Sequence, residues 1–222
     1  ELPILVDGKE VEGETTFTPT EANGKVKVIF TLNAKELAGK EVVVFETLYR
    51  KGEVVVTHED IEDEAQTVVF LEPSITTEAR DKEDGDQDVL PKEKVVIEDT
   101  VTYTNLIPKL EYVIKGKLYD KSTGEPLLVD GKEITAEKIF TPKESNGEVT
   151  LTFVVDASAL AGKEIVVFES LYRENKEVVV HHDIEDKEQT VYVTNPSIQT
   201  EAKDGLTTSN TVLPEMITTI ID

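Results

Sequence analysis

The chain has 222 residues, and its 46 acidic against 23 basic residues give a formal net charge of −23 at pH 7. Such an acidic surface repels nucleic acids and anionic membranes, so neither is an expected partner. The sequence has no cysteine, which excludes disulfides and thiolate metal sites, and no apolar stretch approaches membrane-spanning length.

Short β-branched segments recur along the whole chain between glycine, asparagine-glycine and charged turns. Taken in order, the expected strands are 25–32, 42–48, 54–58, 67–71, 94–97, 100–105, 110–118, 148–155, 165–171, 177–181 and 190–194. The Asn-Gly pairs at 23–24 and 146–147 are typical of hairpins, and the Leu-Ala-Gly triplets at 37–39 and 160–162 favour single helical turns. The pattern predicts an all-β protein folded as a β-sandwich.

The first part of the chain returns in the second part at a constant spacing of 123 residues (181 − 58 = 123). The repeated pairs include Asp7 with Asp130, Phe17 with Phe140, Leu37 with Leu160, Glu46 with Glu169, His58 with His181 and Gln66 with Gln189. Expected seams at Pro73 and Pro196 divide the chain into three parts. Residues 1–72 are then the C-terminal part of a first module that lacks its threonine strand, 73–195 a complete module, and 196–222 the opening strand of a further module.

The repeated block holds all three histidines of the chain, and each copy places a histidine eight residues before a glutamine. A carboxamide is a weak electrophile and a threonine hydroxyl a weak nucleophile, so joining them needs a base, an acid and the exclusion of water. In the complete module His181 fits the role of the base. A buried, protonated Glu169 at the end of the apolar run 165–169 fits that of the acid. Thr100 and Gln189 are the candidate reactants.

The stretches around these residues resemble a known family. They are Asp99-Thr100-Val101-Thr-Tyr103-Thr-Asn105-Leu106-Ile-Pro108, Val166-Val-Phe168-Glu169, and His181 with Gln189-Thr190. In this order they resemble the VaFE repeat of Gram-positive cell-surface adhesins, which includes stalk domains with a self-formed Thr–Gln ester bond. Val167 stands where the family name has alanine. The resemblance implies tandem immunoglobulin-like β-sandwich modules whose first and last strands are joined by that ester.

The resemblance also implies a role for each candidate residue. Thr100 is the nucleophile, Gln189 the acyl donor, His181 the proton shuttle and Glu169 an acid near the bond. Two more carboxyl groups, those of Asp120 and Asp186, are candidate helpers. The equivalents in the first copy are Glu46, His58 and Gln66. His182 receives no role, because its counterpart in the first copy is Glu59.

Plainer interpretations stay open for these residues. Threonine, histidine and glutamine are usually ordinary strand residues, and Glu169 has Arg173 nearby in sequence as a structural partner. Lys132 and Asn146 are weaker candidates for a Lys–Asn isopeptide bond. The acidic loop 81–88 looks like a calcium loop, but its counterpart at 204–210 has lost the acids, which favours a solvated loop. No cofactor and no metal are therefore expected.

Two functions from different classes follow. The first is a structural stalk repeat of a bacterial surface adhesin, stabilised by an ester between Thr100 and Gln189; this is a single-turnover self-reaction and not an enzyme activity. The second is a β-sandwich module that recognises a host protein or glycan without a cross-link. The expected location is extracellular, in a cell-wall-anchored protein. The expected partners are neighbouring repeat modules, with any host-surface ligand bound through other domains.

Overall fold

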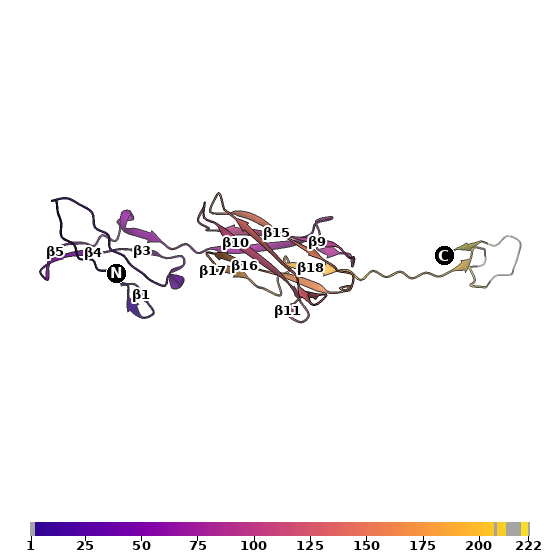
Figure 1. The fold of residues 1–222 in the computed structure, drawn as a ribbon. Coiled ribbons are helices and arrows are strands. Elements are labelled where there is room, and N and C mark those ends of the chain that lie inside the picture. The colour runs from indigo at the N-terminus through magenta and orange to yellow at the C-terminus, as the bar shows by residue number, and fades with distance from the viewer. Residues whose placement is uncertain (1–2, 207, 212–218, 222) are drawn as a thin grey trace.

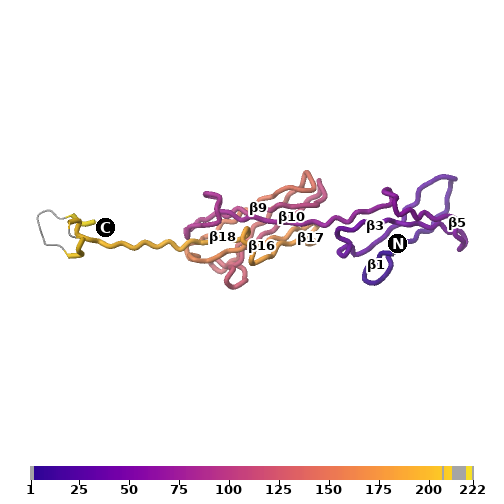
Figure 2. The backbone as a smooth tube through the Cα atoms, turned by 180° about the vertical axis from the view of Figure 1, so that it is seen from behind, coloured from indigo at the N-terminus to yellow at the C-terminus, as the bar shows by residue number. Residues whose placement is uncertain are grey.

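The computed structural model describes residues 3–206, 208–211 and 219–221. Figure 1 shows an elongated arrangement, in which an N-terminal part with short strands, a central β-sandwich and an extended C-terminal segment follow one another; Figure 2 shows the same order from behind. Nowhere in these ranges is there a helix with the length and apolarity needed to cross a membrane. The all-β fold expected from the sequence is confirmed.

The central sandwich consists of two sheets. The smaller sheet has the strand order β15 (Gly147–Val155), β9 (Val95–Thr104) and β7 (Ser74–Asp81), all antiparallel. The larger sheet has the order β11 (Glu125–Pro126), β10 (Tyr112–Asp120), β16 (Glu164–Arg173), β18 (Thr190–Val193) and β8 (Asp88–Val89). In addition, β14 (Thr135–Phe140) pairs with β10, and β17 (Lys176–His181) pairs with β16. A short hairpin, β12 (Leu128–Val129) with β13 (Lys132–Glu133), lies outside both sheets.

The core forms because the strands bury alternate side chains, as a half-buried strand must. In β9 every second residue from Val95 to Tyr103 is buried, and β7 and β10 show the same alternation. Gly116 in β10 leaves room for two core side chains of the opposite sheet. A Cβ atom there would lie 2.6 Å from Phe153 Cζ and 2.7 Å from Leu151 Cδ1, so the two sheets approach closely at this point.

Most strands expected in the complete module are present, and the structure adds β8 and β11 to β14, which the sequence analysis did not predict. Two further differences concern β9 and β7. A single strand, β9, replaces the two strands expected at 94–97 and 100–105. The segment after Pro73, interpreted only as a seam, forms the full strand β7. The Asn-Gly pair at 146–147 does not form a hairpin, because β14 and β15 belong to different sheets. The triplet at 160–162 forms turns and no helix.

Within residues 3–72, the N-terminal copy has six short strands but lacks one that its sequence predicts. Its pairs are β1 (Leu5–Val6) with β2 (Lys9–Glu10), β3 (Glu41–Val43) with β6 (Thr67–Val69), and β4 (Glu46–Arg50) with β5 (Glu53–His58). Two 3-10 turns, η1 (Lys35–Leu37) and η2 (Glu64–Gln66), complete it, and η1 is the helical turn expected at 37–39. The strand expected at 25–32 is absent. Its counterpart β15 pairs with β9, and the given chain holds no β9 counterpart for the first copy, so this segment has no partner.

The C-terminal segment was expected to be the opening strand of a further module. Residues 194–202 carry no paired strand, and β19 (Lys203–Asp204) pairs with β20 (Ile220–Ile221). The remainder of the expected strand, at 207, 212–218 and 222, lies outside the described residues.

Candidate cross-linking site

Four buried polar residues from four parts of the chain meet inside the complete module. Thr77 comes from β7, Asp99 from β9, Glu169 from β16, and Gln189 directly precedes β18. Thr77 is 7% exposed and the other three are fully buried. Strand alternation puts them there, because Thr77 shares the inward face of β7 with Ile75 and Ala79, both buried.

The polar groups of this cluster have only part of their hydrogen bonds. Gln189 Nε2 donates to Glu169 Oε2 at 2.5 Å. Five buried oxygen atoms have no hydrogen-bond partner: Thr77 Oγ1, both carboxyl oxygens of Asp99, Glu169 Oε1 and Gln189 Oε1. Within the described part of the chain, no other buried side-chain nitrogen or oxygen is unpartnered. Such groups are rare in folded proteins and require an explanation, of which a chemical role is one.

Burial decides the protonation of the two carboxyl groups. It raises the pKa of Asp99 to about 7, although Glu169 and His181 oppose the shift. Burial also raises the pKa of Glu169 well above its usual value, and repulsion from the Asp99 carboxyl adds to this. Two carboxyl groups so close in an apolar interior do not both ionise at neutral pH. The pair therefore holds at least one proton.

His181 borders the cluster on the next strand. It is the register partner of Glu169 across β16 and β17, and β17 also packs against β7. His181 Nε2 donates to Asp186 Oδ2 at 2.9 Å. This contact fixes the ring tautomer and leaves Nδ1 as the nitrogen that accepts a proton. Asp186 is itself held by the backbone, because its Oδ1 accepts from Glu188 N at 2.9 Å.

The structure does not bring two of the expected residues to this cluster. Thr100 is next to Asp99 in β9, so its side chain lies on the opposite, partly exposed face of the strand. Thr77 stands in the place expected for Thr100. Asp120 is the register partner of Ile165, four residues from Glu169, where it forms an ion pair with Lys163. This pair lowers the pKa of Asp120, the opposite of the shift in the cluster.

Thr77 and Asp99 were missed in the sequence, although a signal for Thr77 was present. The triplet Thr77-Glu-Ala returns as Thr200-Glu-Ala at the same spacing of 123 residues (200 − 77 = 123). Asp99 is the polar interruption in the inward face of a strand that otherwise buries Val, Ile and Tyr. The spacing of β9 therefore carried the information that residue 99, and not residue 100, faces the core.

The first copy contains the counterparts of Glu169, His181 and Gln189, which form one half of the site. Glu46 pairs in register with His58, and His58 Nε2 donates to Asp63 Oδ2 at 2.9 Å. The His58 side chain is 50% exposed, against 23% for His181, and Gln66 is only partly buried. No described strand of the first copy corresponds to β7 or β9, which bring Thr77 and Asp99 to the cluster, and this half-site is partly exposed.

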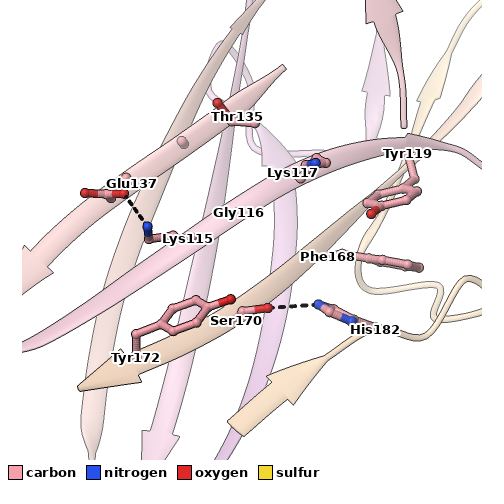
Figure 3. Close-up of a pocket in the computed structure, with 11 residues that line it drawn as sticks. Lys115, Gly116, Lys117, Tyr119, Thr135, Glu137, Phe168, Ser170, Tyr172 and His182 are labelled. Atoms are coloured by element: carbon pink, nitrogen blue, oxygen red, sulfur yellow. Dashed lines mark hydrogen bonds and ion pairs between the residues drawn. The ribbon is translucent and has the colours of Figure 1, made fainter. Parts of the chain in front are cut away.

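His182 lies apart from the cluster, in a groove on the outer face of the larger sheet (Figure 3). The groove has a volume of about 400 Å³. His182 lies 3.0 Å from Ser170 Oγ and stacks on Phe168, whose other neighbour is Tyr119. Since this face points away from the core, the absence of a role for His182 in the expected chemistry is consistent with its position.

A protein-family model described as the T-Q ester bond containing domain matches residues 5–70 and 73–193. The chain belongs to this family. The match confirms the resemblance to Thr–Gln ester-bond repeats. The T-Q domain at 73–193 contains the whole buried cluster, and the one at 5–70 contains the open half-site.

The chain is also similar to several solved structures. Two crystal forms of a Mobiluncus mulieris adhesin, described as containing intramolecular disulfide, isopeptide and ester bond cross-links, are 18% identical, with TM-scores of 0.49 and 0.45. Each covers 60% of this chain, which in turn spans about 60% of the adhesin structures. A putative β-galactosidase from Bacteroides fragilis has 15% identity and a TM-score of 0.36, over 50% of this chain and 17% of its own. No curated protein matches the chain.

Proposed function

We propose that the T-Q domain at 73–193 is a stalk module that cross-links itself through an ester between Thr77 and Gln189. The unpartnered oxygens of the buried cluster are the observation that carries this function. Leaving a buried polar group unpaired costs about 1–3 kcal/mol. The gathering of several such groups around one hydroxyl and one carboxamide is explained if these two are reactants.

The residues of the cluster supply the groups that the reaction needs. Thr77 Oγ attacks Cδ of Gln189, the O–C bond forms, the C–N bond breaks, and ammonia leaves. His181 takes the hydroxyl proton at Nδ1, while Asp186 stabilises the imidazolium. Glu169 lies 2.5 Å from the leaving nitrogen and donates the proton that completes ammonia. His181 then returns its proton to the carboxyl pair, so the net change is the loss of one ammonia.

This chemistry makes the protein its own substrate. The reaction runs once for each module and leaves no free nucleophile, so the domain is a structural element and not an enzyme with outside substrates. Its place is an extracellular stalk on the surface of a Gram-positive bacterium, in a protein anchored to the cell wall. Its partners there are the neighbouring repeat modules, and host ligands bind to other domains.

Intact-protein mass spectrometry tests the proposal directly. The 222-residue chain is expected to weigh one ammonia less than its sequence, because only the 73–193 module brings a threonine to its glutamine. Gln189→Ala should restore the full mass, and fragmentation of the wild type should join the peptide containing Thr77 to the one containing Gln189. A full mass in folded wild-type protein would exclude the ester and favour the alternative of a ligand-binding module without a cross-link.

A further inference from the structure

A side-chain amide outside the buried cluster contacts the backbone around Gln189. The chain leaves β7, the strand of Thr77, at Asp81 and returns at β8, which pairs in parallel with β18. Gln87 directly precedes β8 and is partly buried. The loop 82–87 therefore links the strand of the nucleophile to the strand of the acyl donor.

The side chain of Gln87 contacts backbone carbonyl groups on both sides of Gln189 in the sequence. Its Nε2 donates to Lys187 O at 2.6 Å and to Thr190 O at 2.8 Å, with Glu188 O at 3.3 Å. The backbone carbonyl oxygen of Gln87 accepts from Tyr192 N at 2.8 Å. One amide group with two hydrogens thus serves three carbonyl oxygens, and the backbone that carries Gln189 turns around it.

Two other strands hold the same segment. Ala79 N of β7 donates to Glu188 O at 2.9 Å, and Val167 N of β16 donates to Gln189 O at 3.1 Å. These contacts restrain residues 188 and 189 from one side each, whereas Gln87 spans residues 187 to 190. Its side chain is one of the contacts that hold the turn of this segment, together with Thr190 N to Lys187 O at 3.2 Å and Thr190 Oγ1 to Asp186 O at 2.6 Å.

We propose that Gln87 is a positioning residue for ester formation, and that its amide holds the Gln189 carboxamide in line with Thr77. This inference rests on the proposed function. The reaction depends on the approach of Oγ to Cδ within the cluster, and a displacement of about 1 Å can slow such a step about a hundredfold. The further repeat keeps an amide at the equivalent position, Asn210 (87 + 123 = 210).

The test follows ammonia loss over time in freshly synthesised full-length chain, by intact mass. Gln87→Met keeps the length of the side chain without a donor, and Gln87→Lys keeps a donor. We expect Gln87→Met to slow ester formation at least about tenfold. Gln87→Lys should restore the rate to within about threefold of wild type. The pH profile of the rate should keep its shape, because Gln87 moves no proton.

A second measurement separates positioning from folding. In a Thr77→Val background, which has no ester, Gln87→Met should leave the melting temperature within a few degrees of Thr77→Val alone. Ester formation at the wild-type rate in Gln87→Met would overturn the inference, as would equal slowing by Met and Lys or a collapse of the melting temperature. If the wild-type chain itself loses no ammonia, the proposed function fails. If wild type and Gln87→Met both lose ammonia at the same rate, only the inference about Gln87 fails.

Discussion

Replacing Thr77 by valine removes the proposed nucleophile while keeping the shape of the side chain. The ester would close a loop of 112 residues (189 − 77 = 112), which the chain-entropy model values at roughly 4–5 kcal/mol. In the cross-linked chain the ester has consumed this hydroxyl, so the variant loses the whole of that contribution, about 4–5 kcal/mol. For a module of 121 residues (193 − 73 + 1 = 121), that corresponds to a fall in Tm of roughly 16–20 °C.

The assay combines intact mass with calorimetry on the same sample. Thr77→Val should show the full sequence mass and the lower Tm. Thr100→Val is the matched control, because Thr100 carries the same side chain one strand away on a partly exposed face. The control should retain the one-ammonia deficit and a Tm close to that of wild type. A deficit that persists in Thr77→Val, or one that disappears in Thr100→Val, would refute the assignment of the nucleophile.

Three further outcomes are expected. In the Thr77→Val background, stability should fall as pH rises from about 4 to about 7, because the folded chain keeps a proton on Asp99, whose pKa burial raises from 3.8 to about 7, after the unfolded chain has lost it. Asp99→Asn should flatten this slope in urea titrations, and an unchanged slope would contradict the explanation. Asp186→Asn should slow ester formation at least about tenfold, whereas Asp120→Asn should leave the ammonia loss unchanged; equal effects would show that Asp120 belongs to the site. Gly116→Ala should lower stability by about 1–3 kcal/mol, because its Cβ overlaps the Phe153 ring, and an unchanged urea midpoint would argue against this contact.

The repeat and the strand pattern predicted much of this molecule. Alternating β-branched segments indicated an all-β fold, and the constant spacing of 123 residues paired Glu46 with Glu169 and His58 with His181. The family resemblance singled out Gln189, Glu169, His181 and Asp186, and in the structure Gln189 contacts Glu169 and His181 contacts Asp186. These residues lie close together in sequence or on adjacent strands, so local spacing was sufficient.

The other half of the site depended on strand register, which the spacing of single residues does not fix. Splitting β9 into two strands hid the alternation that buries Asp99 and turns Thr100 outward. The segment after Pro73 was expected to be a boundary between modules, so the strand β7 and its residue Thr77 were not predicted. A shift of one residue in a strand exchanges its two faces, so the choice of the proposed nucleophile was the prediction most sensitive to this error. The unpaired segment 25–32 shows the same limit, because a strand needs a partner as well as a suitable sequence.

The hydrogen bond from Ala79 N to Glu188 O has a consequence for the length of the molecule under load. It marks the place where the entering and leaving strands meet, two residues from Thr77 and one from Gln189. The proposed ester at this place would carry the tension, so the 112 residue steps from Thr77 to Gln189 would bear no force and would stay folded. Fully extended, they would add roughly 370–400 Å to the chain. In the proposed stalk, modules cross-linked in this way would therefore keep a constant length under load.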